Sequence, residues 1–199
     1  MPGTPYVYER QTEYWTSRQI EDFLLDEGFE VITYPLTQRS EAVVPADFLV
    51  FDRGRTKLIG FQYKALYRNG DDHWELDSQQ HAELRHYPWI YYATSELRQP
   101  AEFRNALYRT RFFSTSFAFE AQLPLHGDRP YYRWGAFFDA FRQCKVGRVI
   151  ASRMDLSKVL LPTQQAVARA TRELSETLPD LFLADLEQRR VVHYSPLVR

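Results

Sequence analysis

Apolar residues recur at helical spacing near the start of the chain. Ile20, Phe23 and Leu24 fall on one face of the segment from 13 to 27, and Gly28 follows it. A glycine directly after such a stripe is typical of a left-handed helix cap. The pattern therefore predicts an amphipathic helix over residues 13–27.

Three stretches rich in β-branched and aromatic residues come next, at 29–34, 46–51 and 57–64. Pro35 closes the first stretch, and the turn-rich segment 52–55 joins the other two. The pattern predicts one strand followed by a two-stranded hairpin.

A short helix is expected to begin at a capping Asp77 or Ser78 and to end at Leu84, and a buried strand is expected over 89–93. The order helix, strand, hairpin, helix, strand favours an α/β fold with a mixed central sheet flanked by helices. We expect this core to span residues 13–93, approximately.

The second half of the chain alternates between helical and strand patterns. The expected elements are a helix over 101–109, a strand over 113–121, an aromatic helix over 134–141 that ends near Gly147, a helix over 167–178, and a hairpin from 181–187 and 191–194. We interpret residues 94–199 as an α+β elaboration of a single domain that covers residues 1–199.

The composition agrees with one self-sufficient domain, because 199 residues with 44% hydrophobic content can bury a full core. The single cysteine, Cys144, excludes an internal disulfide and is expected to be a buried, inert thiol on the aromatic helix. One cysteine alone points to a reducing compartment, so we expect a cytoplasmic protein. No apolar run is long enough to cross a bilayer, so we expect no membrane partner. With a net charge of -1, any surface that binds nucleic acid must be local.

Three polar residues, an aspartate, a glutamine and a lysine, stand in the largely apolar strands of the predicted hairpin. Asp47 opens the first strand, after Val44, Pro45 and Ala46, and the second strand ends in the run Gln62-Tyr63-Lys64. Residues two apart on a strand point to the same side, so Gln62 and Lys64 project together and Tyr63 projects to the other side. If the two strands pair, Asp47 comes close to both.

This arrangement resembles the signature of the PD-(D/E)xK nuclease superfamily, in the glutamine variant seen in Mrr-type restriction nucleases. The resemblance implies that Asp47 binds a divalent cation, Mg²⁺ or Mn²⁺, together with the side-chain carbonyl of Gln62 and the backbone carbonyl of Tyr63. All three are hard oxygen donors. Lys64 is expected to orient the attacking water or to stabilise the phosphate. Gln62 replaces a carboxylate, which should weaken metal binding.

The family often adds a glutamate from the first helix. Glu21 shares a helix face with Leu24, and Glu13 lies on the apolar stripe, so either could face the site. We favour Glu21 over Glu13. The position where the family most often has its glutamate holds, approximately, Ser17.

Gln79 and Gln80 open the helix on which several family members place a polar residue that supports the metal-bound water or touches phosphate. We favour Gln80 for this role. For His73, His81 and His86, surface or capping positions are the simpler interpretation.

Two sets of residues could bind nucleic acid, by base stacking or through phosphate. They are the aromatic residues Tyr87, Trp89, Tyr91 and Tyr92 and the arginines Arg98, Arg104, Arg109 and Arg111. Core packing and a solvated basic face explain the same residues.

The sequence thus leads to a metal-dependent nuclease acting on nucleic acid, DNA rather than RNA, in defence, restriction or repair. The resemblance also implies a homodimer or a partner protein for cutting both strands. One alternative is a nuclease-fold module that binds nucleic acid or protein without cutting. Another is a metal-independent ribonuclease that uses His81 or His86.

Overall fold

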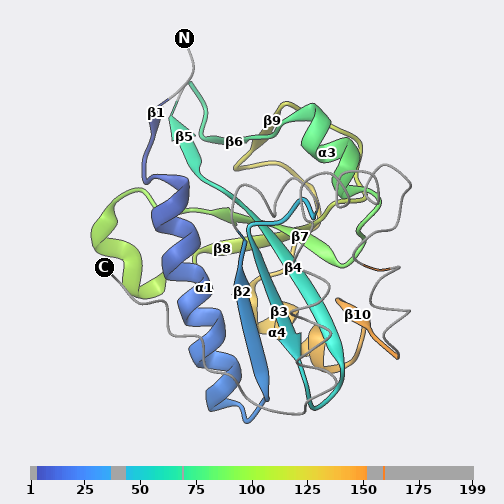
Figure 1. The fold of residues 1–199 in the computed structure, drawn as a ribbon. Coiled ribbons are helices and arrows are strands. Elements are labelled where there is room, and N and C mark those ends of the chain that lie inside the picture. Colours follow the sequence, from blue (N-terminus) through green and yellow to red (C-terminus); the bar gives the residue numbers. More distant parts are fainter. Residues whose placement is uncertain (1–3, 37–43, 69, 152–158, 160–199) are drawn as a thin grey trace.

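The computed structural model describes residues 4–36, 44–68, 70–151 and 159. It is a mixed α/β structure with two sheets, which confirms the predicted class (Figure 1). The helices are α1 (Glu9–Asp26), α3 (Ser78–Leu84) and α4 (Trp134–Arg142), with a 3₁₀-helix η1 (Pro100–Asn105).

The larger sheet has the order β2-β3-β4-β7-β8, and β10 pairs with the free part of β4. Its strands are β2 (Val31–Pro35), β3 (Phe48–Asp52), β4 (Lys57–Lys64), β7 (Ile90–Ser95), β8 (Thr110–Ser114) and β10 (Arg148–Val149). The smaller sheet has the order β1-β5-β6-β9. Its strands are β1 (Thr4–Pro5), β5 (Leu66–Arg68), β6 (His73–Glu75) and β9 (Gln122–Pro124).

The β3–β4 hairpin is antiparallel, with Phe48 opposite Phe61 and Asp52 opposite Lys57. Strand β7 then pairs with β4 in parallel. Alternate residues of these strands enter two separate hydrophobic cores, one on each side of the sheet. This explains why β3 and β4 read as nearly continuous apolar runs, since a sheet covered on both faces has no solvent side.

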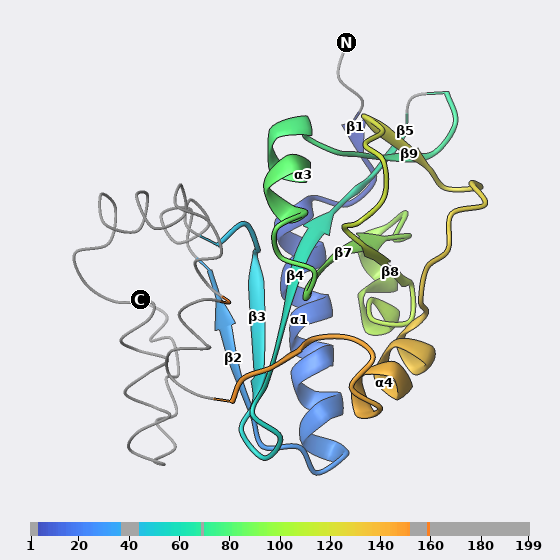
Figure 2. The same ribbon diagram turned by 90° about the vertical axis from the view of Figure 1, so that its right-hand side faces the viewer.

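Helices α1 and α4 cover one face of the larger sheet, where Ile20 and Leu24 pack with Phe137 and Phe141. Helix α3 and the smaller sheet contribute to the other core, through Leu84 and Trp74 among others. Figures 1 and 2 show α1 lying along the sheet and α3 near the end of β4 that continues into β5. Residues after 93, which we interpreted as an elaboration, complete the same sheet and core, since β8 pairs with β7 and α4 packs on the face that α1 covers.

Helix α1 begins at Glu9, four residues earlier than the sequence predicts, and ends before Gly28, whose φ of +78° confirms the predicted left-handed cap. Tyr8 occupies the N-cap position without a side-chain hydrogen bond. The sequence therefore lacks the polar residue that usually marks a helix start.

Several expectations for the second half are wrong. The predicted strand over 113–121 is β8, which ends at Ser114, followed by a turn and then β9. Phe117 and Phe119 instead pack against His81 from the intervening loop. The expected helix over 101–109 is the shorter η1. The elements expected from 167 onward lie outside the described residues.

Cys144 is exposed, with a φ of +58°, and so is not the buried thiol that we expected. The reason is that α4 ends at Arg142, so Cys144 lies past the helical stripe.

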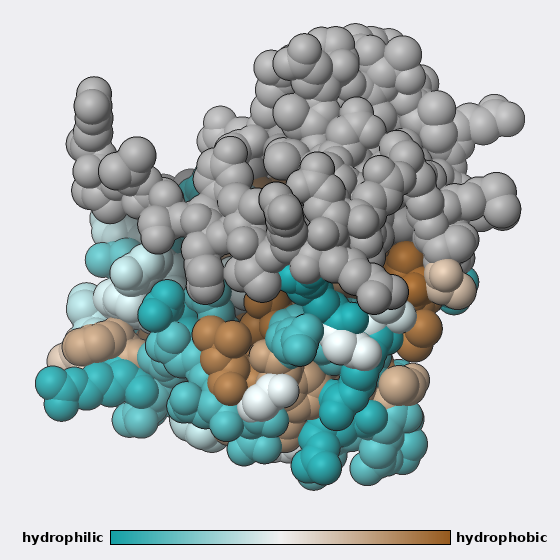
Figure 3. All heavy atoms as spheres, turned by 60° about the horizontal axis from the view of Figure 1, so that its bottom comes forward, coloured by the Kyte–Doolittle hydropathy of each residue, from teal (hydrophilic) through white to brown (hydrophobic). Residues whose placement is uncertain are grey.

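The face shown in Figure 3 carries mostly hydrophilic side chains with smaller hydrophobic areas between them, on the part of the surface that the described residues form. Among the described helices, none has the length and apolar character that spanning a membrane requires.

Candidate functional site

Asp47 is held rigidly just before β3 begins. Its backbone N–H donates to Phe61 O at 2.9 Å, and its backbone carbonyl accepts from Leu36 N–H at 2.8 Å. Upstream, Pro45 has no N–H to extend the ladder, and the chain turns where Ala46 N–H donates to Val44 O. The carboxylate is therefore placed by backbone contacts on both sides and is 7% exposed.

One oxygen of this carboxylate accepts two hydrogen bonds from β4. Asp47 Oδ2 accepts from the backbone N–H of Tyr63 at 2.6 Å and from Gln62 Nε2 at 2.8 Å. The predicted approach of Asp47 to the end of β4 is thus observed. The amide of Gln62 presents its NH₂ group to Asp47, however, and not the carbonyl oxygen that the family resemblance assigns to a cation.

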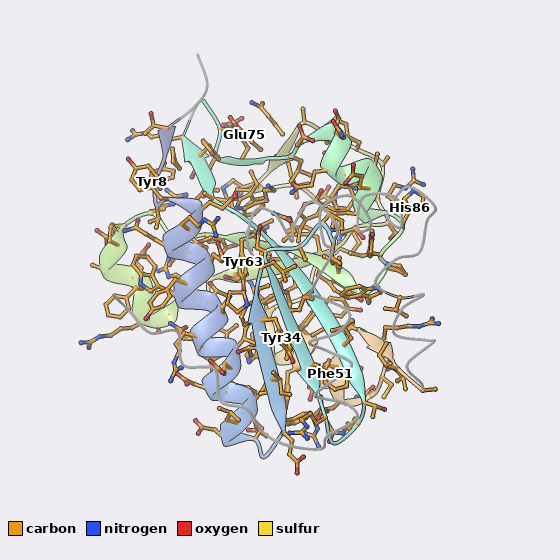
Figure 4. The ribbon with its side chains drawn as sticks, viewed as in Figure 1. Tyr8, Tyr34, Phe51, Tyr63, Glu75 and His86 are labelled. Atoms are coloured by element: carbon orange, nitrogen blue, oxygen red, sulfur yellow. The ribbon has the colours of Figure 1, made fainter. Side chains whose placement is uncertain are left out.

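Tyr63 projects to the opposite side of β4, as predicted. Its ring is fully buried in the core that α1 covers, and its hydroxyl lies 2.9 Å from Ser17 Oγ. Figure 4 shows Tyr63 between α1 and the sheet. Ser17 therefore faces the core side of β4 and anchors the residue whose peptide N–H holds Asp47.

The charge on Asp47 is unfavourable in this environment. Burial, partly offset by the hydrogen bond from Tyr63 N–H, raises the pKa of the Asp47 carboxyl to about 7. The negative charges of Glu9 and Glu13 raise this pKa further, and the positive charge of Lys64 lowers it. Lys64, Glu9 and Glu13 are therefore electrostatic neighbours of Asp47, and a cation at this position would relieve the excess negative charge.

Lys64 has a side chain that is 12% exposed, and its Nζ lies 3.8 Å from Glu9 Oε2. Glu9 was missed by sequence reasoning because the predicted helix began after it. Glu13, the second choice for the helix acid, has a side chain that is 12% exposed and pairs with Arg10 at 3.3 Å. The first turns of α1 thus bring two carboxylates toward the end of β4.

Glu21, the favoured helix acid, lies elsewhere. It accepts a hydrogen bond from Thr33 Oγ1 at 3.0 Å on β2 and pairs with Arg18. Eight residues separate it from Glu13, which corresponds to about 12 Å along a helix. Its place on α1 brings it to β2, whereas Glu9 and Glu13 act on Asp47.

Gln80 lies in the first turn of α3, where its backbone N–H donates to the capping carboxylate of Asp77 at 2.7 Å. This confirms the predicted start of the helix. Its side-chain oxygen Oε1 is buried and has no hydrogen-bond partner among the described residues. Among the described residues, no hydrogen bond links Gln80 to Asp47.

Two of the three histidines, His73 and His81, differ from the expected surface or capping positions, whereas His86 agrees with them. His81 is buried, with Nδ1 3.1 Å from the Tyr92 hydroxyl and Nε2 2.9 Å from Phe117 O. Because both ring nitrogens have partners, His81 is a structural residue of the core. His73 is also buried, whereas His86 is exposed.

The two sets of residues considered for nucleic-acid binding mostly pack in the core or form ion pairs. The four aromatic residues are all buried: Tyr87, Trp89, Tyr91 and Tyr92. Three of the arginines form ion pairs, namely Arg98 with Asp72, Arg109 with Glu102 and Arg111 with Glu96. Arg104 lies over the ring of the exposed Phe103.

Metal-ligating side chains are not concentrated: the described residues contain no group of three or more histidine, cysteine, aspartate and glutamate side chains that could hold a metal ion. The oxygen donors that the resemblance assigns to a cation here are the Asp47 carboxylate, the Gln62 side-chain carbonyl and the Tyr63 peptide carbonyl. Mg²⁺ often binds proteins through one or two carboxylates and completes its shell with water and substrate phosphate. The set fits such an ion in kind if Gln62 turns its carbonyl toward it.

No protein family matches the chain, and no match was found among curated proteins or solved structures.

Proposed function

We propose that this chain is a divalent-metal-dependent nuclease that hydrolyses phosphodiester bonds of nucleic acid, DNA rather than RNA. The observation that carries the proposal is the contact of Asp47 with Gln62 and with Tyr63 N–H across two adjacent strands. Lys64 follows two residues after Gln62 on the same side of β4. By the resemblance, a carboxylate and an amide carbonyl hold the cation that assists phosphodiester cleavage, and an ammonium stabilises the phosphate.

The order of the elements supports the same proposal. Helix α1, the antiparallel strands β2, β3 and β4, helix α3 and the parallel strand β7 follow one another as in a restriction-endonuclease-like core, with β5 and β6 inserted. By this resemblance, the setting is defence, restriction or repair, and a homodimer or a partner protein supplies the second cut.

Each residue of the site has a distinct role in this proposal. Asp47, the Gln62 carbonyl and the Tyr63 peptide carbonyl would hold Mg²⁺ or Mn²⁺, with Glu9 or Glu13 as the nearby acid. The cation, when bound, lowers the pKa of water and neutralises charge on the phosphate. The Tyr63 N–H keeps Asp47 in place. Lys64 exchanges Glu9 for the phosphate and stabilises its developing charge.

The test is incubation of the purified protein with supercoiled plasmid, linear DNA, single-stranded DNA and RNA, each with Mg²⁺, Mn²⁺ or EDTA. The proposal expects cleavage of DNA that EDTA abolishes and that Asp47→Asn abolishes in the same buffers. Asp139→Asn, which changes an exposed carboxylate on α4, is the matched control and should cut like the wild type. Cleavage that survives EDTA or Asp47→Asn would contradict the proposal.

A second candidate is a module of the same fold that binds nucleic acid or protein without cutting. It is favoured by the internal pairing of the site, since Gln62 donates to Asp47 and Lys64 lies beside Glu9. Titration of Mn²⁺ distinguishes the two candidates, because a module of this kind binds its partner equally well with and without the cation and cuts under neither condition.

A further inference from the structure

Exposed aromatic side chains gather on the outer side of α1 and on η1. Tyr8 and Tyr14 are 70% and 69% exposed, and Phe103 is 41% exposed. The two elements lie side by side (Figure 1), and Gln19 Nε2 on α1 donates a hydrogen bond to Phe103 O at 2.7 Å. Single exposed rings are common on protein surfaces, whereas several exposed rings close together often mark a binding surface.

Arginines lie among these rings. Arg10, Tyr14 and Arg18 are four residues apart along α1 and so form one stripe. Arg104 lies with its guanidinium 5.8 Å from the centre of the Phe103 ring. We call these six residues the tyrosine–arginine surface: Tyr8, Arg10, Tyr14, Arg18, Phe103 and Arg104.

Acidic residues beside Arg10 and Arg18 reduce the positive charge of this surface, but they do not occupy all the N–H donors of the two guanidinium groups. Arg10 contacts Glu13 through Nη1, and Arg18 contacts Glu21 and Asp22 through Nη1 and Nη2. A guanidinium has five N–H donors, so donors remain for a phosphate. Both arginine side chains are more than 60% exposed, and exposed ion pairs of this kind are weak.

The surface is continuous with the candidate site. Tyr8 is the N-cap residue of α1, and the next residue, Glu9, lies 3.8 Å from Lys64 Nζ. Figure 4 shows Tyr8 at the end of α1 closest to β1 and β5. A chain lying along α1 would therefore reach the end of β4, where Asp47 and Lys64 lie.

We propose that the tyrosine–arginine surface binds single-stranded nucleic acid and leads the strand to the Asp47 site. This inference rests on the proposed nuclease function, and it specifies the substrate class. Protruding rings match unpaired bases, whose faces are free to stack, whereas a duplex hides them. The surface offers few cations for a duplex backbone, and the chain has a net charge of -1, so stacking must supply much of the affinity.

The inference is tested by fluorescence anisotropy with labelled oligothymidylate, oligouridylate and a DNA duplex, in EDTA and in the Asp47→Asn background. Binding is then measured without cation and without cleavage. The single strands should bind more tightly than the duplex, and the DNA and RNA arms identify which strand is preferred. With three arginines, the slope of log K against log salt should be no steeper than about −2.

Variants of Tyr14 separate stacking from simple apolar contact. Tyr14→Ala should raise the Kd for the single strand roughly 5- to 150-fold, the range for loss of one stacked base. Tyr14→Phe should retain wild-type affinity, and Tyr14→Leu should not. Val149→Ala removes an exposed apolar side chain of β10, away from α1 and η1, and should have no effect.

Equal affinity for duplex and single strand, or an unchanged Kd in Tyr14→Ala, would overturn the inference. Its failure is distinct from failure of the nuclease proposal. Metal-dependent cleavage without single-strand binding leaves the nuclease and removes this inference. Single-strand binding that depends on Tyr14, without cleavage under any cation, leaves this surface and removes the nuclease.

Discussion

The buried carboxylate of Asp47 should make the stability of the protein fall as the pH rises. Its pKa in the folded protein is about 7, above the ordinary value of 3.8. Between these two values the folded protein keeps a proton that the unfolded chain has released. The free energy of unfolding therefore decreases with rising pH across this window and levels off above about pH 7.

The magnitude follows from the pH interval. From pH 5 to a folded pKa of about 7 is about two units, and each unit corresponds to about 1.36 kcal/mol. Asp47 should therefore cost the protein about 3 kcal/mol on going from pH 5 to pH 8. Asp47→Asn removes the titration. The asparagine Oδ1 can still accept the hydrogen bonds of Tyr63 N–H and Gln62 Nε2, so the fold should be retained.

Urea unfolding of the wild type and Asp47→Asn at pH 5 and pH 8, in EDTA, measures this effect. The difference in unfolding free energy should shift in favour of the variant by about 3 kcal/mol between the two pH values. Asp139→Asn, at an exposed position, should show a shift within about 0.5 kcal/mol. An Asp47→Asn shift no larger than this control, or a shift in favour of the wild type, would refute the reasoning.

Further predictions concern the neighbours of Asp47. Gln62→Glu places a second carboxylate beside Asp47, so Mn²⁺ should bind more tightly than to the wild type in calorimetric titration at pH 8, and unchanged affinity would speak against a ligand at this position. Because the cation must displace the Asp47 proton, its apparent affinity should rise about tenfold per unit from pH 5 to pH 7 and then level off, whereas a flat profile would exclude Asp47 as the ligand. Tyr63→Phe removes the buried contact with Ser17 Oγ and should lower the unfolding free energy by about 1–3 kcal/mol in urea, with no loss if Ser17 is not its partner.

The hairpin and the meeting of Asp47 with Gln62 could be predicted because they follow from covalent geometry. Side chains alternate along a strand, so the polar positions of the run Gln62-Tyr63-Lys64 fixed which residues project together. The turn-rich segment between the two strands set their antiparallel pairing. Only local sequence was needed for this part of the site.

The first turn of α1 could not be predicted in the same way. Glu9 lies in this turn, so it was not among the predicted site residues. Tyr8 makes no side-chain cap, and the residue before it, Val7, packs in a cluster with Leu97 and Ala106. The helix start is therefore stabilised by contacts with residues far along the chain. No signal in the sequence near Glu9 marks it.

The loop between β8 and β9 shows how a tertiary contact can imitate a strand. Phe117 and Phe119 alternate with small and polar residues, but they do so because both rings pack against His81. His81 is itself buried by these rings, which is why its surroundings could not be read from its own segment. The orientation of the Gln62 amide likewise depends on burial of Asp47 and not on local sequence.

Lys64 provides the most direct test of the nuclease proposal. The rate of DNA cleavage in Mg²⁺ should be compared between the wild type, Lys64→Met, and Lys145→Met, which changes an exposed lysine and serves as the control. The proposal predicts that Lys64→Met cuts about 100- to 1000-fold more slowly while Lys145→Met cuts at the wild-type rate. Equal rates in all three proteins, or no metal-dependent cleavage by the wild type on any DNA substrate, would contradict it.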